Sequence, residues 1–106
     1  SKSQKKDWAR ELPKYFSLRQ NLRGAILFTD IRNPMRELDI TMYEMLVGYN
    51  LPTLIVLTKK DKVSIEEVKA AEKDINHVFG SCISFSIKEG VSVEKLVKEI
   101  NELLSS

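Results

Sequence analysis

The sequence predicts an α/β fold, in which a parallel sheet is flanked by helices in a three-layer arrangement. Three nearly continuous apolar runs alternate with segments whose apolar residues recur at helical spacing. Apolar runs of this kind are typical of parallel strands that are buried on both faces. At 106 residues, of which 42% are hydrophobic and 30% are charged, the chain suits a single domain with a real core.

The first two predicted elements are a helix and a strand. Apolar residues near the amino terminus recur at helical spacing, and a proline among them should kink or break the helix. The residues concerned are Trp8, Leu12, Pro13, Tyr15 and Phe16. The run GAILFTDI follows and predicts a strand over residues 24–31 that is buried on both faces.

A second helix and a second strand come next. The helix is predicted by one apolar stripe, which consists of Leu38, Met42, Met45, Leu46 and Tyr49. Asn50 and Pro52 should close this helix. The run PTLIVLT then predicts a buried strand over residues 52–58.

The third helix has a recognisable beginning and end. Ser64 and Glu67 have capping-box spacing, so Ser64 should cap the helix while Glu67 returns to its backbone amide. The side chains expected to face inward are Ile65, Val68, Ala71, Ile75, Val78 and Phe79. Gly80 should end the helix.

A short strand and a last helix complete the predicted order. The run CISFSI predicts a strand over residues 82–87, in which Cys82 is a small buried hydrophobic residue. Gly90 should turn the chain, and Ser92 should cap the last helix. The inward side chains of that helix are expected to be Val93, Leu96, Val97, Ile100, Leu103 and Leu104.

Charge and cysteine content exclude several classes of protein. The chain has 17 basic and 15 acidic residues, and a net charge of +2 implies no strong field for a polyanion. A single cysteine excludes an internal disulfide framework and a cysteine-based zinc cluster. No apolar stretch approaches the roughly 18 residues that a bilayer requires, so we expect a cytoplasmic protein with no membrane partner.

Polar residues follow each predicted strand, at the end where parallel α/β folds bind ligands. In the sequence TKKDK after the second strand, the Asp61 carboxylate could accept hydrogen bonds from guanine N1–H and N2–H₂. Adenine has no matching pair of donors, so such a group discriminates between the bases. Lys59 could lay its methylene stem along the base. Alone, this motif often matches by chance, and a solvated charged turn before a helix is then the favoured interpretation.

The loop after the third strand should lie beside the TKKDK loop, because the two loops follow successive strands of one sheet. A backbone amide there, expected from Ile87, could donate to guanine O6. Ser86 could brace the loop, and Lys88 could cover the other face of the base. The two loops together favour a guanine site more strongly than either does alone.

Three patterns occur in the chain in a fixed order. The pattern D-x-R-x-P-x-x-x-x-D is formed by Asp30, Arg32, Pro34 and Asp39. The pattern T-K-x-D-K is formed by Thr58, Lys59, Asp61 and Lys62, and Phe85, Ser86, Ile87 and Lys88 resemble an F-S-S-x-K region. Together they resemble the EngB-type (YihA/YsxC) family of small bacterial GTPases, over essentially the whole chain. The resemblance implies GTP or GDP as ligand, with guanine bound by Thr58, Lys59, Asp61, Lys62, Ser86, Ile87 and Lys88.

The resemblance also implies that residues 1–106 are a partial GTPase domain, the carboxyl-terminal half of a Ras-like P-loop GTPase fold. The phosphate-binding pattern G-x-x-x-x-G-K-[ST] and the D-x-P-G magnesium motif do not occur in the sequence. We therefore expect the chain alone to bind nucleotide weakly and not to hydrolyse GTP, with Mg²⁺ needed only in the intact protein. The first strand would lack one neighbour, which predicts self-association through that edge.

Proteins of this family are associated with assembly of the large ribosomal subunit and with formation of the division septum. The resemblance therefore implies the large ribosomal subunit as a partner of the intact protein. Composition and spacing carry no information on this point.

A second interpretation is a receiver-like phosphoacceptor domain. In that interpretation Asp30 takes a phosphoryl group, Thr58 moves with it, and Lys88 contacts the phosphate. The positions that fit are Asp30, Pro34, Met35, Thr58 and Lys88. If the receiver interpretation does not hold, Asp30 and Asp39 are expected to be turn and helix-capping residues. Arg32 and Arg36 are then expected to be solvated loop residues. A third interpretation is an α/β interaction module without a ligand.

Overall fold

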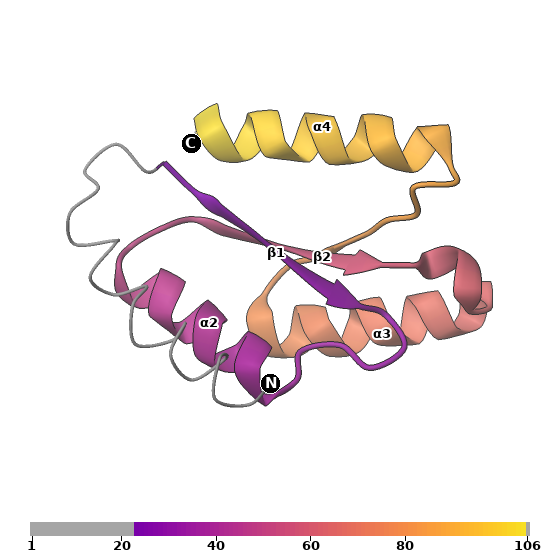
Figure 1. Cartoon of the computed structure of the whole chain (residues 1–106), viewed down its shortest axis with the longest axis horizontal. Coiled ribbons are helices and arrows are strands. Elements are labelled where there is room, and N and C mark those ends of the chain that lie inside the picture. The colour runs from indigo at the N-terminus through magenta and orange to yellow at the C-terminus, as the bar shows by residue number, and fades with distance from the viewer. Residues whose placement is uncertain (1–22, 106) are drawn as a thin grey trace.

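The computed structural model describes residues 23–105, which form a three-stranded parallel sheet with helices on both faces (Figure 1). In chain order the elements are β1 (Ala25–Asp30), α2 (Glu37–Gly48), β2 (Thr53–Thr58), η1 (Lys60–Lys62), α3 (Ile65–Phe79), β3 (Ile83–Ser84) and α4 (Gly90–Ser105). The predicted α/β class with three layers is confirmed. The helix predicted around Trp8, Leu12, Pro13, Tyr15 and Phe16 lies outside the described residues.

The sheet has the order β1-β2-β3, so β2 is its central strand. β1 and β2 pair in parallel from Ala25 opposite Thr53 to Asp30 opposite Thr58. Residues 55–57 of β2 are at most 1% exposed, which agrees with the buried strand that the apolar run predicted. Because all three strands point the same way, their carboxyl ends and the loops that follow them lie at one edge of the sheet.

Each face of the sheet has its own apolar core. On one face, Ile31, Met35, Ile55, Leu57 and Ile75 form a buried cluster with side chains from α2 and α3. On the other face, Leu54, Val56 and Ile83 pack with Leu96, Ile100 and Leu103 of α4. In Figure 1 α4 accordingly lies above the sheet, and α2 and α3 lie below it.

The predicted helix ends are largely confirmed. The Ser64 Oγ accepts a hydrogen bond from the Glu67 amide at 3.1 Å, and the Ser64 amide donates to Glu67 Oε1 at 3.2 Å, which completes the capping box. Gly80 ends α3 with a φ of 99°, which favours glycine. Asn50, which was predicted to close α2, has a φ of 60° just beyond the end of that helix.

Two strand predictions need correction. β1 is not buried on both faces, because Phe28 is 53% exposed. This side chain shares a face of the strand with Ile26, but the cover that α4 gives to that face is incomplete at the outer edge of the sheet. The third strand comprises Ile83–Ser84 rather than residues 82–87. The Phe85 amide still donates to the Leu57 carbonyl at 2.8 Å, and the following residues then form a loop.

Several side chains that were predicted to face inward are exposed. They are Ile65 and Val78 of α3, and Val93, Val97 and Leu104 of α4, with exposed fractions from 40% to 70%. A three-stranded sheet is narrow, so it covers only the central strip of each apolar helix face.

The predicted start of the last helix is also wrong. Ser92 does not cap α4 but lies inside it, and its amide donates to the Glu89 carbonyl at 3.0 Å. Gly90 is the first residue of α4.

No helix among residues 23–105 is long and apolar enough to cross a membrane. In the same part of the chain, no group of three or more His, Cys, Asp or Glu residues is placed to hold a metal ion.

Candidate functional site

The loops that follow β2 and β3 are joined at the carboxyl edge of the sheet. The Lys60 amide donates to the Phe85 carbonyl at 3.2 Å, which extends the strand pairing by one step into the loops. Lys60 Nζ also lies 3.7 Å from Glu89 Oε1. The structure therefore brings the TKKDK segment and the segment from Ser86 to Lys88 side by side, as their positions after successive strands predicted.

Asp61 and Ser86 form the central contact between these loops. Ser86 is 1% exposed, and its hydroxyl donates to Asp61 Oδ1 at 2.8 Å while it accepts from the Lys88 amide at 3.2 Å. The Ser86 hydrogen bond is the main reason that the pKa of Asp61 lies below its usual value, and the charges of Lys88 and Lys62 add to the effect. Asp61 is therefore ionised at neutral pH, and the Ser86 hydroxyl fixes the orientation of its carboxylate.

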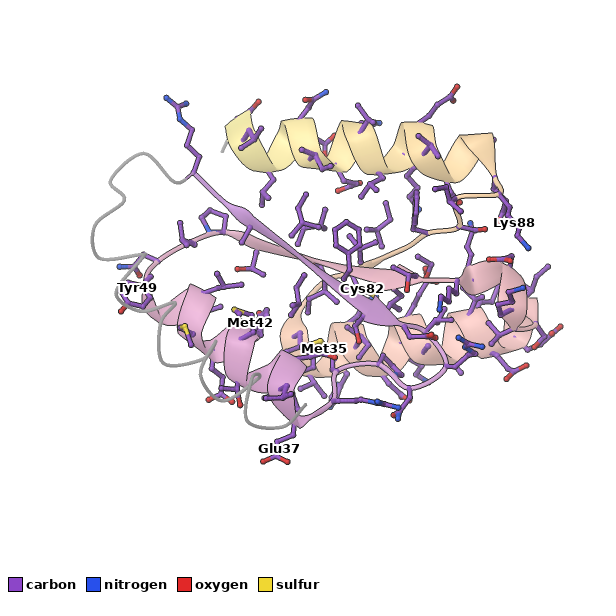
Figure 2. The ribbon with its side chains drawn as sticks, viewed as in Figure 1. Met35, Glu37, Met42, Tyr49, Cys82 and Lys88 are labelled. Atoms are coloured by element: carbon purple, nitrogen blue, oxygen red, sulfur yellow. The ribbon has the colours of Figure 1, made fainter. Side chains whose placement is uncertain are left out.

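Two lysines extend over this edge from opposite loops. Lys88 Nζ lies 3.6 Å from Asp61 Oδ2, and Figure 2 shows the Lys88 side chain pointing outward from the body of the molecule. Lys59 has a left-handed backbone with a φ of 62° and a ψ of 36°, an uncommon conformation for a residue other than glycine. Its Nζ lies 3.7 Å from Asp30 Oδ2 on the neighbouring strand end.

The other predicted site residues have more distant or structural positions. The Thr58 hydroxyl donates to the Thr29 carbonyl at 3.3 Å, so it binds β1. The Lys62 amide donates to the Lys59 carbonyl at 2.9 Å and closes the 3₁₀ turn. Ile87 is 81% exposed, and its amide makes no hydrogen bond within residues 23–105. This amide is therefore available to a ligand.

Asp30 is held by an arginine that the sequence analysis left as a solvated loop residue. Arg32 donates to it three times: its amide and Nε contact Asp30 Oδ1 at 2.9 and 3.0 Å, and Nη2 contacts Oδ2 at 2.7 Å. These hydrogen bonds lower the pKa of Asp30 well below its usual range. The spacing of two residues in D-x-R is the signal that points to this contact, because the amide of the second residue after an Asp commonly binds the Asp carboxylate.

The arrangement around Asp30 gives the receiver interpretation no support. Its carboxylate is occupied by Arg32 and Lys59, whereas Lys88 pairs with Asp61. Met35, another position of that pattern, is 7% exposed and packs in the core. Asp39 has the predicted capping role, because its Oδ2 accepts from the Arg36 amide at the start of α2 at 3.2 Å.

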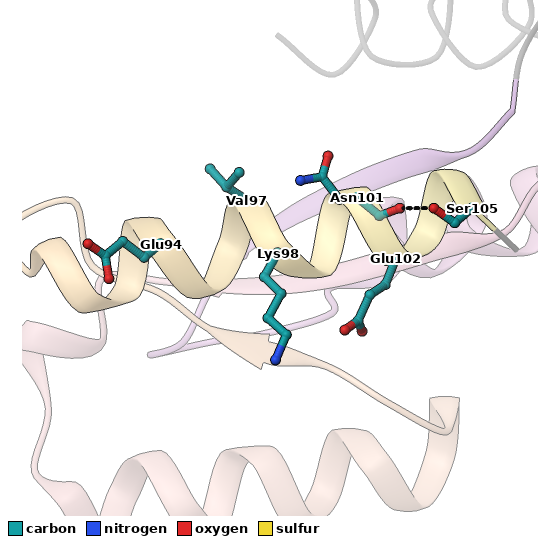
Figure 3. Close-up of a pocket in the computed structure, with 6 residues that line it drawn as sticks. All are labelled: Glu94, Val97, Lys98, Asn101, Glu102 and Ser105. Carbon is teal, nitrogen blue, oxygen red and sulfur yellow. Dashed lines mark hydrogen bonds between the residues drawn. The ribbon is translucent and has the colours of Figure 1, made fainter.

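The hollow shown in Figure 3 lies elsewhere, along the outward side of α4. It is lined by Glu94, Val97, Lys98, Asn101, Glu102 and Ser105. All of these residues belong to one helix, and none belongs to the loops at the strand ends. The hollow is thus separate from the candidate site.

No protein-family model matches the chain. Several curated relatives do, and each has the name "Probable GTP-binding protein EngB". The protein from Mannheimia succiniciproducens is 32% identical over 108 residues, which cover 96% of this chain and 53% of the relative. The protein from Ligilactobacillus salivarius is 43% identical over 75 residues, which cover 71% of this chain and 38% of the relative. The chain therefore spans about half, or less, of the length of these relatives.

The fold also matches a solved structure, that of translation elongation factor SelB from Methanococcus maripaludis in complex with the GTP analogue GPPNHP. The TM-score is 0.72, and the match covers 92% of this chain and 24% of SelB, at 24% identity. This similarity supports a P-loop GTPase-like fold. The sequence identities of 32% and 43% to the curated relatives show that the chain is an EngB-like fragment, similar to part of the GTP-binding proteins of that name.

Proposed function

We propose that the loops after β2 and β3 bind the guanine base of GTP or GDP. The observation that carries this proposal is the fixed, ionised carboxylate of Asp61, which Ser86 supports at 2.8 Å. A carboxylate has about four acceptor positions, so Asp61 can bind Ser86 and Lys88 and still accept from guanine N1–H and N2–H₂. The proposal takes further support from the GTP-binding name of the relatives.

The remaining predicted residues have complementary roles. The Ile87 amide, which has no partner within residues 23–105, donates to guanine O6. The methylene stems of Lys59 and Lys88 cover the two faces of the base, while their ammonium groups stay near Asp30 and Asp61. Thr58 and Lys62 act at a distance from the base, since they fix the backbone of the loop between them.

Phosphate binding and hydrolysis belong to the intact protein. The sequence lacks the pattern G-x-x-x-x-G-K-[ST], whose amides and lysine bind phosphates and whose hydroxyl binds Mg²⁺. Guanine contacts alone leave the phosphates in solvent. The chain should therefore bind nucleotide weakly, with a dissociation constant around the millimolar level, and should not hydrolyse GTP.

The experiment is a ¹⁵N NMR titration of the chain with millimolar GDP, and with ADP as the control nucleotide. We expect GDP alone to shift the amides of Lys59, Asp61, Ser86 and Ile87. The variant Asp61→Asn should abolish these shifts, whereas Asp74→Asn, a change at an exposed position of α3, should retain them. Equal shifts with GDP and ADP, or none with either, would contradict guanine binding. A GTPase rate that Asp61→Ala abolishes would contradict the expectation that the chain alone does not hydrolyse GTP.

For the intact protein, we propose a role in assembly of the large ribosomal subunit and in cell division, in the cytoplasm, on the basis of the family resemblance. The measurement is co-sedimentation of the full-length protein with large-subunit precursors. We expect association in the GTP state. Failure to co-sediment with these precursors in the GTP state would argue against this role.

Self-association through β1 is a further proposal. The Ala25 and Ile31 amides donate to the Pro52 and Thr58 carbonyls, on the side of β2. The alternate residues Ile26, Phe28 and Asp30 therefore direct their amides to the outer edge. No strand pairs with this edge within the described residues. An unpaired edge with an exposed phenylalanine can pair with a second copy.

Sedimentation velocity over a concentration series tests this proposal. Phe28→Lys should reduce association, because a charge on an edge strand opposes pairing. Val78→Lys is the matched control, since Val78 is 69% exposed but lies on α3, away from the edge. A monomer at all concentrations, or equal effects of the two variants, would contradict pairing through β1.

A further inference from the structure

The end of β1 contributes a charged cluster to the candidate site, through a residue that the guanine contacts do not include. Asp30 stands opposite Thr58 in the β1–β2 register, so it lies beside the first residue of the base-contacting loop, Lys59. The Asp30 carboxylate lies between two cations, with Arg32 Nη2 at 2.7 Å and Lys59 Nζ at 3.7 Å from the same oxygen, Oδ2.

The two contacts of Asp30 differ in kind. Arg32 makes three hydrogen bonds to the carboxylate, two of them from its guanidinium, and this geometry fixes the orientation of the carboxylate. Lys59 has a single, longer ion pair to the same group, from a flexible side chain that is 57% exposed. Arg32 therefore holds Asp30, and Asp30 in turn restricts Lys59.

The restriction matters because Lys59 has an unusual backbone. Its left-handed conformation is sparsely populated by residues with a side chain, and it is stable only where neighbouring contacts support it. The conformation also determines the direction in which the methylene stem leaves the loop. An ion pair at the end of the stem limits the rotamers that Lys59 can adopt before a ligand arrives, which reduces the entropy lost on binding.

We propose that Asp30, oriented by Arg32, is a positioning residue for guanine binding: it holds the Lys59 ammonium so that the Lys59 stem is already placed at the base site. This inference rests on the proposed guanine site and adds to it a dependence on the end of β1. Asp30 touches neither base nor phosphate, and its effect on binding passes through Lys59 alone.

A double-mutant cycle with the 106-residue chain tests this role. Asp30→Asn retains the size of the side chain and an oxygen that can accept from the Arg32 amide, but it removes the negative charge. Lys59→Met retains an apolar stem without the ammonium. The dissociation constant for GDP is measured for both variants, for the double variant, and for Asp74→Asn as a matched change at an exposed aspartate.

We expect D30N to weaken GDP binding about two- to fivefold when Lys59 is present, which is the range for an exposed ion pair. In the K59M background the same change should have no effect. Methylene ¹³C relaxation gives a readout without nucleotide: D30N should make the Lys59 side chain as mobile as that of Lys69, which is exposed on α3 and has no ion pair within residues 23–105.

The outcomes separate this inference from the proposed function. If D30N weakens binding equally in both backgrounds, Asp30 has a general structural role and the inference is wrong. The inference is also wrong if GDP binds selectively to the wild-type chain but D30N changes neither affinity nor Lys59 mobility. If the wild-type chain shows no selectivity for GDP over ADP, the proposed function itself fails, and the inference fails with it.

Discussion

Removal of the Ser86 hydroxyl should weaken ligand binding at the candidate site while the fold survives. The hydroxyl is almost fully buried and makes two hydrogen bonds, one to Asp61 Oδ1 and one from the Lys88 amide. In Ser86→Ala the exposed side of Asp61 can recover water, but the partly buried Lys88 amide loses its partner. The free energy of unfolding should therefore fall by about 1–2 kcal/mol. A folded domain of ordinary stability survives a loss of this size.

Ser86→Ala should also change the candidate site itself. Because the Ser86 hydrogen bond is the main cause of the low pKa of Asp61, this pKa should rise toward its usual value in Ser86→Ala. Asp61 should also become mobile, and GDP affinity should fall by roughly three- to tenfold, the equivalent of one lost hydrogen bond. The measurements are ¹³C-detected titration of the Asp61 carboxyl, urea unfolding and the GDP titration.

Ser84 offers a matched control for this experiment. Ser84 is 5% exposed and donates to Glu72 Oε2 at 2.8 Å, so it repeats the chemistry of Ser86 on the same strand segment but with a partner on α3. Ser84→Ala should cost similar stability and leave the pKa of Asp61 and the GDP affinity unchanged. If Ser84→Ala and Ser86→Ala have the same effect on GDP affinity, the loss reflects general destabilisation, and our account of Ser86 is refuted.

Three further predictions follow from single groups. Ser64→Ala removes one side of the capping box and should lower the free energy of unfolding by about 0.5–2 kcal/mol in urea unfolding. The pKa values of Asp30 and Asp61 are lowered in the folded chain, so their contribution to stability is present at neutral pH and is lost as the pH falls below the usual aspartate pKa of 3.8. Asp30→Asn should flatten this acid dependence in thermal unfolding from pH 7 to 2. Cys82, which was predicted to be buried, is only partly buried, and this burial raises its pKa to about 11. Alkylation at pH 8 should therefore be slow in the folded chain and fast in denaturant, and equal rates would contradict protection of the thiol by the fold.

The local structure of this chain could be predicted well from its sequence. The continuous apolar runs specified β1 and β2 as strands, although only β2 has the burial on both faces that such runs predict. The pattern from Ser64 to Glu67 specified the start of α3, because a capping box is made by residues that are neighbours along the chain. The proximity of Asp61 and Ser86 could also be predicted, because parallel strands bring their following loops to one edge.

Other features depended on what lies next to each element. Helical spacing identifies an apolar side of α4, but the width of the sheet decides that Leu96, Ile100 and Leu103 are covered while Val97 is exposed. Composition likewise could not show that Phe28 is half-exposed, since its exposure depends on its place at the outer edge of the sheet.

The charged cluster of the site also depends on which elements lie next to one another. The sequence alone determined which loops carry the polar groups, through the positions of Asp61 and Ser86 after successive strands. The D-x-R spacing is a local signal for the contact between Arg32 and Asp30. Only the tertiary structure decided that Asp30 reaches Lys59, 29 positions further along the chain. Ion pairs form wherever the fold brings opposite charges within a few ångströms, and that distance depends on strand register, which local sequence patterns do not specify.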